Sequence, residues 1–397
     1  LADFLVGAVD VARFDERESY SLAESRAALR WARHRLASIA RADMLLCTFP
    51  TVLCVLLHEI FPHMPVLFVA IANPLFAAPG CAKREDNTVR DCETKEASEY
   101  LAALRAMLLD ESGLVRGVAA YTVTAALVGY QTGVSLPVAG KAGRYLPAAA
   151  TWRMQREADV LVARSRFLET AFGANFQGLA RELLASHSIP LQLVLQQDLS
   201  GYVSYEDLST FRAVVIFPQD LGLHKFTEHY AMAMPIWMPS RELAYRLQSL
   251  VPWGMVSYSG SWRGATSPSE EQQRLPPGHP ARLRPPEETW PDPGSPELAH
   301  RPFFNAQTVP FPLAKVAFWY EFGEFVAYPA VQTFTSVPEM ILGLATADLG
   351  AASTSMRRFR AELWRTTRAV YAAAAGEVAE ATAKLAVEEA ALASRPR

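Results

Sequence analysis

The chain has 397 residues, of which half are apolar and a fifth are charged, and its formal net charge is -3. The length favours two domains, and the composition is that of a folded globular protein. Lys and Arg are scattered among matching Asp and Glu, so the sequence offers no basic surface for a polyanion. We therefore expect no nucleic-acid partner.

The apolar run at 44–73 is the nearest approach to a membrane segment. Pro50, Pro62 and Pro65 cut it into pieces shorter than the roughly 20 residues that a span needs, so a span there is not expected. The chain begins at Leu1 without a Met, a basic leader or a cleavage site. Localisation therefore stays open, as does membrane association through a segment upstream of Leu1.

The four cysteines fall into two pairs. Cys47 and Cys54 lie in apolar runs, which predicts that they behave as small buried hydrophobes. Cys81 and Cys92 bracket a polar loop and could close it as a disulfide in an oxidising compartment. No CxxC spacing is present, so a zinc site is not indicated.

The first part of the chain alternates strand and helix patterns, which predicts a parallel sheet. The expected elements are a strand at 42–49, a helix at 50–60, strands at 65–73 and 114–122, helices at 96–111 and 123–133, and a strand at 134–139. Gly133 is expected to end its helix. The pattern indicates a Rossmann-like domain over residues 1–140.

A second alternating series follows the linker at 140–152. It predicts strands at 157–164, 191–197, 212–218 and 235–238, with helices at 176–187, 205–211 and from about Leu221. This is a second Rossmann-like domain over residues 150–260. Residues 264–300 are dense in Pro, Ser and charge and predict a disordered insertion, and residues 301–385 predict a folded aromatic segment followed by C-terminal helices.

Polar side chains follow the apolar strands of the second series. In an open parallel sheet, ligands bind outside the carboxyl ends of the strands, and paired arginines there suit a phosphate. The helix from about Leu221 adds the positive end of its dipole, which favours an anionic diphosphate. The residues expected to bind such a ligand are Arg164, Arg166, Gln219, His224, Lys225, Glu228 and Ser240.

Glu228 can accept hydrogen bonds from ribose hydroxyls, as the acidic residue of dinucleotide-binding folds does. A solvated helix position is the ordinary alternative for Glu228, and a solvated turn is the alternative for Arg164 and Arg166.

The stretch "FTEHYAMAMPIWMPS" at 226–240 resembles the helix of GT-B glycosyltransferases that has the form E-A-M-A-x-G-x-P-V-V. The matching residues are Glu228, Ala231, Ala233, Pro235, Ile236 and Trp237. Ala233 stands where the family usually has Gly. A looser similarity to exostosin-like members extends over the preceding strand, and "FWYEFGEFVAYPAVQTFTSVPEMILGL" resembles the tail of uncharacterised glycosyltransferase-like proteins.

The resemblance implies an α/β fold with two Rossmann-like domains that face each other across a cleft, and a helical C-terminal segment that crosses back to the first domain. It implies an enzyme that moves a sugar from a nucleotide-diphosphate sugar, UDP- or GDP-linked, to a hydroxyl of a glycan or glycoprotein. The acceptor would bind in 1–140 and the donor in 150–260. The secretory lumen is then favoured for a eukaryotic protein and the cytoplasm otherwise.

No Asp-x-Asp pair is present, so a site without metal or other cofactor is expected, in which fixed positive charge stabilises the leaving diphosphate. The candidates for a general base are Asp10, His58 and Glu59, none of them marked by a motif. The chain also lacks the GxGxxG, P-loop and GxSxG motifs. The rival hypothesis is a non-catalytic, two-lobed protein that binds a sugar or nucleotide, or serves as a scaffold.

Overall fold

The structure is a computed structural model of the whole chain, and it describes residues 21–32, 42–48, 50–71, 74, 81–83, 89–92, 94–141, 143, 145–199, 201–218, 221–248 and 313–393. Asp10, Gln219 and the predicted insertion at 264–300 lie outside these ranges. The fold is α/β with parallel sheets and a helical C-terminal segment, as the sequence predicted, and it is compatible with a Rossmann-like architecture. The chain divides into two compact units, the first made of Leu1–Gly140, Ser261–Arg284 and Thr366–Arg397, the second of Lys141–Gly260 and Pro285–Arg365.

The first unit contains a three-stranded parallel sheet in the order β1-β2-β5. Its elements are α3 (Leu22–Ala32), β1 (Leu45–Cys47), α4 (Thr51–Ile60), β2 (Val66–Ala70), β3 (Cys81–Lys83), β4 (Val89–Cys92), α5 (Thr94–Leu108), β5 (Val115–Ala119) and α6 (Thr122–Thr132). All five residues of the central strand β2 are buried, which explains its unbroken apolar run. The predicted βαβ unit is confirmed.

Two features of α6 and the chain beyond it bear on the sequence prediction. Gly133 ends α6 in the left-handed conformation, with φ of 71°, as expected for a glycine cap. The predicted strand at 134–139 is wrong, since only one isolated bridge joins Ala119 to Val138. Pro137 has no N–H to donate to a ladder, which limits pairing there.

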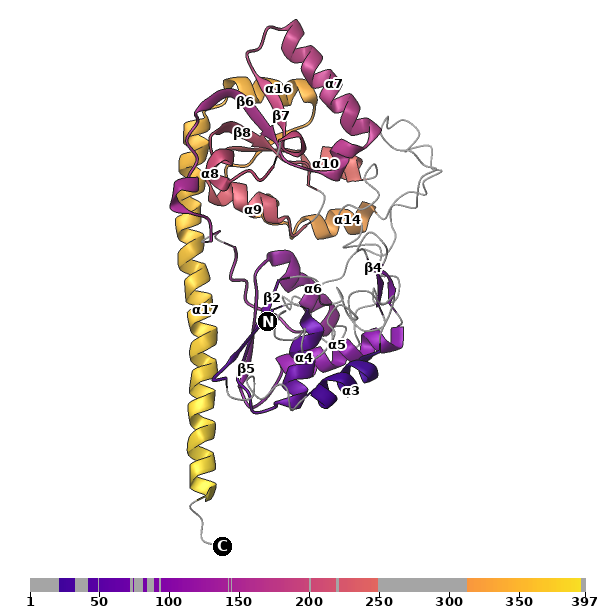
Figure 1. Cartoon of the computed structure of the whole chain (residues 1–397), viewed down its shortest axis with the longest axis vertical. Helices are drawn as coiled ribbons and strands as arrows, with labels where there is room; N and C mark the ends of the chain where they lie inside the picture. The colour runs from indigo at the N-terminus through magenta and orange to yellow at the C-terminus, as the bar shows by residue number, and fades with distance from the viewer. Residues whose placement is uncertain are drawn as a thin grey trace. The chain divides into compact units, whose positions relative to one another are not determined.

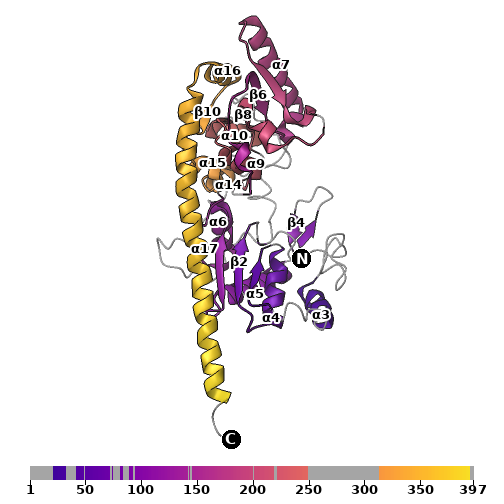
Figure 2. The same cartoon turned by 60° about the vertical axis from the view of Figure 1, so that its left-hand side comes forward.

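The helices α3 to α6 cover one face of the first sheet, and the end of the long C-terminal helix α17 (Leu349–Ala393) covers the other (Figures 1 and 2). Arg116 of β5 pairs with Glu377 of α17 at 2.5 Å. The Thr367 hydroxyl donates to the carbonyl of Ala139 at 2.5 Å. The C-terminal segment therefore packs on the first unit, as the family resemblance implied.

One of the two cysteine pairs differs from the sequence prediction. Cys47 and Cys54 are buried, as predicted, but they are joined in a disulfide rather than free. The turn from β1 into α4 brings their Cα atoms to 5.7 Å, inside the range that a disulfide spans. Cys81 and Cys92 are opposite each other in the antiparallel pair of β3 and β4. Their side chains lie outside the described part, so the disulfide between them stays a prediction.

The second unit contains a five-stranded, fully parallel sheet in the order β7-β6-β8-β9-β10. Its strands are β6 (Arg156–Val162), β7 (Gln192–Leu195), β8 (Phe211–Val215), β9 (Ile236–Pro239) and β10 (Gln332–Phe334). Its helices are η4 (Arg166–Glu169), α7 (Ala171–Ser186), α8 (Tyr205–Leu208), α9 (His224–Ala231), α10 (Arg241–Gln248), α14 (Leu313–Tyr320), α15 (Glu324–Ala327) and α16 (Val337–Thr346).

This sheet is doubly wound, with α7 and α16 together on one face and α9 on the other (Figure 1). The chain leaves β6 toward β7 and then crosses over to β8, so the direction of winding reverses between β6 and β8. Such a reversal opens a crevice at the carboxyl ends of the two strands. The four predicted strands of this series are confirmed, and β10 is a fifth that the sequence reasoning did not specify.

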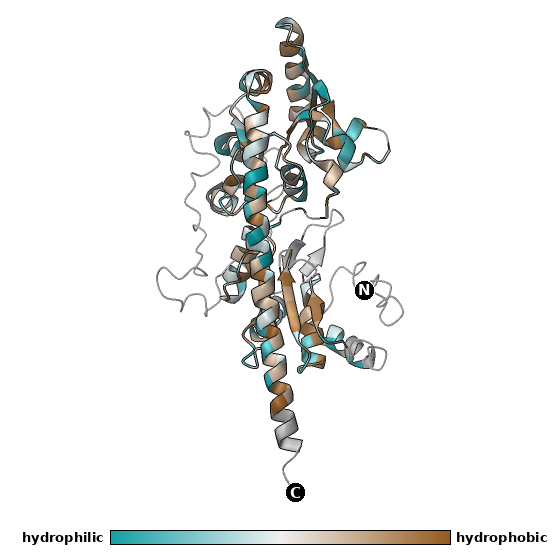
Figure 3. Ribbon diagram, turned by 90° about the vertical axis from the view of Figure 1, so that its left-hand side faces the viewer, coloured by the Kyte–Doolittle hydropathy of each residue, from teal (hydrophilic) through white to brown (hydrophobic). Residues whose placement is uncertain are grey.

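The helix α17 is 45 residues long and buries one face. The buried positions recur at intervals built from three and four residues, as for a helix packed along one side: Leu349, Ala352, Met356, Thr367, Ala374 and Val378. The colours of Figure 3 show polar and apolar residues mixed along it. Of the helices in the described ranges, none has both the length and the apolar content to cross a bilayer.

Candidate functional site

The candidate site is built on α9, which follows β8 and begins at the carboxyl edge of the second sheet. One side of the helix is held in the core by aromatic contacts. The Phe226 ring lies 5.7 Å from the rings of Tyr230 and Tyr328 and 6.0 Å from that of Phe325. This packing turns His224 and Glu228, one helical turn apart, toward the linker residues that precede β6.

Glu228 accepts two phenol hydrogen bonds on one oxygen. The hydroxyls of Tyr145 and Tyr205 both donate to Glu228 Oε1 at 2.9 Å. Burial and the hydrogen bond to Glu228 raise the pKa of Tyr145 strongly and that of Tyr205 to about 12. Both phenols are therefore protonated donors at neutral pH. Within the described residues, no further hydrogen bond to the Glu228 carboxylate accompanies these two.

Lys141 and His224 form a second contact beside Glu228. Lys141 Nζ lies 2.5 Å from His224 Nδ1 and 5.4 Å from the centre of the Tyr145 ring. Burial lowers the pKa of both groups, and the Lys141 charge lowers that of His224 further. Glu228 opposes these shifts in both cases. The pair is consistent with a neutral imidazole that accepts a hydrogen bond from the ammonium.

Lys225 lies at the carboxyl ends of β6 and β7. Its Nζ is 3.4 Å from the carbonyl oxygen of Arg164 and 3.5 Å from Gln196 Oε1. The same Gln196 oxygen accepts the backbone N–H of Arg164 at 3.1 Å. Burial lowers the pKa of Lys225, followed by the charge of Arg164, while Glu228 raises it. Lys225 and the exposed residue Arg164 thus lie together at the carboxyl end of β6.

We refer to the residues around the carboxylate as the Glu228 cluster: Lys141, Tyr145, Tyr205, His224, Lys225 and Glu228. The charge of Glu228 acts on each of the other five. Of the seven binding residues predicted from sequence, the structure brings three into this cluster, and it places Arg164 next to Lys225.

Ser240 is not part of this cluster. Ser240 is nearly buried and caps α10, where its Oγ accepts the Leu243 N–H at 3.3 Å. This capping bond accounts for Ser240 without a ligand. Arg166 begins η4, but its side chain lies outside the described part, as does the whole of Gln219.

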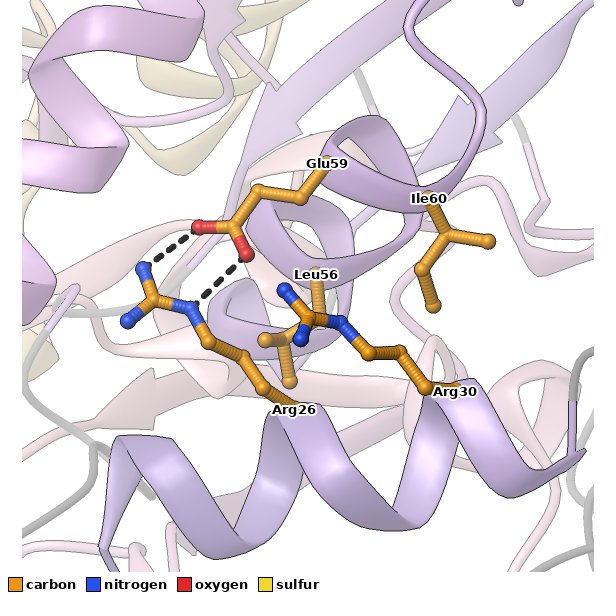
Figure 4. Close-up of a pocket in the computed structure, with 5 residues that line it drawn as sticks. All are labelled: Arg26, Arg30, Leu56, Glu59 and Ile60. Atoms are coloured by element: carbon orange, nitrogen blue, oxygen red, sulfur yellow. Dashed lines mark hydrogen bonds and ion pairs between the residues drawn. The ribbon is translucent and has the colours of Figure 1, made fainter.

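The base candidates of the first unit lie on α4. Glu59 forms a two-point ion pair with Arg26, with Oε2 2.8 Å from Nε and Oε1 2.7 Å from Nη2 (Figure 4). This pair lines a small pocket between α3 and α4, together with Arg30, Leu56 and Ile60. His58 is half-buried, and burial lowers its pKa. Glu59 is therefore paired with Arg26. Asp10 lies outside the described residues.

Sequence reasoning missed Lys141, Tyr145 and Tyr205. Tyr145 is 83 residues from Glu228, in the stretch read as a plain linker, and Tyr205 is 23 residues away in a one-turn helix. The glycines of "GKAGRY" were the one sequence signal that this stretch packs closely against another segment, because a glycine permits close approach of two backbones. Gly143 does lie against α9.

Among the described residues, no group of three or more His, Cys, Asp or Glu side chains could hold a metal ion. Comparisons of the chain with protein-family models, with curated proteins and with solved structures found no significant match.

Proposed function

We propose that the protein is a glycosyltransferase of the GT-B type, which binds a nucleotide-diphosphate sugar on the second unit. The first unit would bind the hydroxyl acceptor, a glycan or glycoprotein, with the two Rossmann-like domains facing across a cleft. The observation that carries the proposal is the Glu228 cluster, which lies next to the winding reversal of a doubly wound parallel sheet.

Two parts of a donor, the ribose and the diphosphate, have candidate partners in this arrangement. Glu228 Oε2 accepts a ribose hydroxyl, because Tyr145 and Tyr205 already occupy Oε1. Lys225 and Arg164 face the diphosphate, whose charge they offset together with the N-terminal end of α9. These cations would also stabilise the diphosphate as it leaves, so no metal is required for that step.

The test is a thermal-shift and calorimetric titration of the full chain with UDP, GDP, ADP and CMP and with their sugars. A ligand bound only by the native state raises the melting temperature. We expect one nucleotide to bind, with a loss of about 10- to 100-fold in affinity for Glu228→Gln, as for a lost hydrogen bond to a charged group. Glu182→Gln, on the exposed surface of α7, is the matched control and should bind normally.

No shift with any nucleotide at millimolar concentration, or equal affinity of Glu228→Gln and the control, would refute the donor site. Where a nucleotide binds, the release of nucleoside diphosphate from its sugar conjugate in the presence of acceptor glycans measures transfer.

A non-catalytic binding protein is the second candidate, and the ion pair of Glu59 with Arg26 favours it. That pair gives Glu59 a structural role that needs no catalysis. Nucleotide-sugar binding that depends on Glu228, with no transfer to any acceptor and no hydrolysis, would select this alternative.

A further inference from the structure

The segment that leads into the second unit runs along α9. We call its described residues, Lys141, Gly143, Tyr145 and Leu146, the linker segment. Gly143 has φ of 61°, and a Cβ atom placed on it would lie 2.2 Å from the Cβ of Ala231. Only a glycine allows so close an approach in that backbone conformation. The Leu146 N–H closes a local turn by donating to the Gly143 carbonyl at 3.0 Å.

Two side-chain contacts fasten the linker segment to the helix on either side of Gly143. Tyr145 donates to Glu228 at 2.9 Å, and Lys141 Nζ lies 2.5 Å from His224 Nδ1. The tyrosine contact does not change between mild acid and neutral pH, because the phenol is protonated throughout. The lysine contact depends on the protonation of His224, since the ammonium has donors only.

Protonation of His224 removes the acceptor of this contact. The imidazolium carries an N–H on both ring nitrogens, so Lys141 and His224 become two cations at hydrogen-bond distance. Among the described residues, the charges that act on His224 are those of Lys141 from the linker segment and Glu228 from its own helix, and Glu228 and Glu324 act on Lys141. Glu228 is already held by two phenols and is shared among three basic groups, so the repulsion remains.

We propose that the Lys141–His224 contact is a pH-dependent latch, which holds the linker segment against α9 while His224 is neutral and releases it when His224 is protonated. The latch does not depend on the function proposed above.

The test is hydrogen exchange of the full chain, with mass-spectrometric readout of a peptide that covers the linker segment. Exchange is measured at about pH 7.5 and about pH 5 and corrected for the intrinsic pH dependence of amide exchange, so that it reports local opening. A peptide of β8, in the same unit, is the internal reference. In the wild type we expect protection of the linker segment to fall about tenfold or more at the lower pH, with β8 unchanged.

Two variants decide the outcome. His224→Gln keeps an acceptor at every pH and should abolish the fall, while Lys141→Met should show low protection at both pH values. Protection that is constant in the wild type, or that falls equally in His224→Gln, would overturn the latch. A matching fall in the β8 peptide would assign the effect to the whole unit and would overturn it too.

Discussion

His229 lies within the core of the second unit, and its burial makes stability depend on pH. The side chain is 3% exposed, and its Nδ1 has no hydrogen-bond partner among the described residues. Burial, followed by the charge of Lys225, lowers the pKa of His229 to about 3, from an ordinary value of 6.5. The native state therefore holds the neutral imidazole, whereas the unfolded chain takes up a proton below about pH 6.5.

The magnitude follows from the two pKa values. Because the folded-state value is the lower one, the contribution is fully present above about pH 6.5 and is lost as the pH falls toward 3. A shift of one pKa unit corresponds to about 1.4 kcal/mol, so His229 alone should lower the free energy of unfolding by about 2 kcal/mol between pH 7.5 and pH 5.

Urea denaturation, followed by tryptophan fluorescence at several pH values, measures this loss. We expect His229→Leu and His229→Gln to lose about 2 kcal/mol less than the wild type between pH 7.5 and pH 5, whatever their stability at pH 7.5. Leu and Gln differ in polarity, but neither takes up a proton in this pH range. A weaker pH dependence of the free energy of unfolding in both variants would therefore assign the loss to protonation of His229. Parallel pH profiles for wild type and variants would refute the reasoning.

Three further predictions concern stability. Ser188 has φ of 52° just after α7, so Ser188→Gly should stabilise the fold by about 0.5–1 kcal/mol in urea denaturation, and a loss would contradict this. Gly143→Ala should lower the melting temperature, whereas Gly178→Ala, whose added Cβ meets nothing, should raise it slightly; equal effects would count against the close packing. Dithiothreitol should destabilise the wild type by about 2–3 kcal/mol more than a Cys47→Ser/Cys54→Ser variant, because only the wild type has the Cys47–Cys54 loop to lose, and thiol titration checks the reduction.

The strands β1, β2, β5 and β6 to β9 followed from the sequence because their signals are local, whereas β3, β4 and β10 did not. Val66–Ala70 is an unbroken apolar run and is a buried strand, and Gly133 ends its helix where the pattern placed it. The stretch at 134–139 is also largely apolar but forms a single bridge, between Ala119 and Val138. A strand also needs a neighbouring strand whose backbone N–H and C=O groups match its own.

The candidate site could be predicted only in part. Glu228, His224 and Lys225 share one helix, so their spacing is visible in the sequence. The phenols that fix Glu228 come from remote segments, and only the fold brings them there. In the same way, seven residues separate Cys47 from Cys54, and only the turn into α4 places them at bonding distance.

Ala233 has φ of 57°, a left-handed conformation that favours glycine. It stands at the position where the motif that the stretch at 226–240 resembles carries Gly.

The long helix α17 has a consequence for the order of synthesis. Its residues from Thr366 onward belong to the first unit, whose other described residues leave the ribosome more than two hundred positions earlier. Until those last turns emerge, one face of the first sheet has no covering helix, while every strand of the second unit has already been made. In nascent chains halted before Thr366, one face of the first sheet should therefore be exposed. Exposed apolar strands bind chaperones or aggregate.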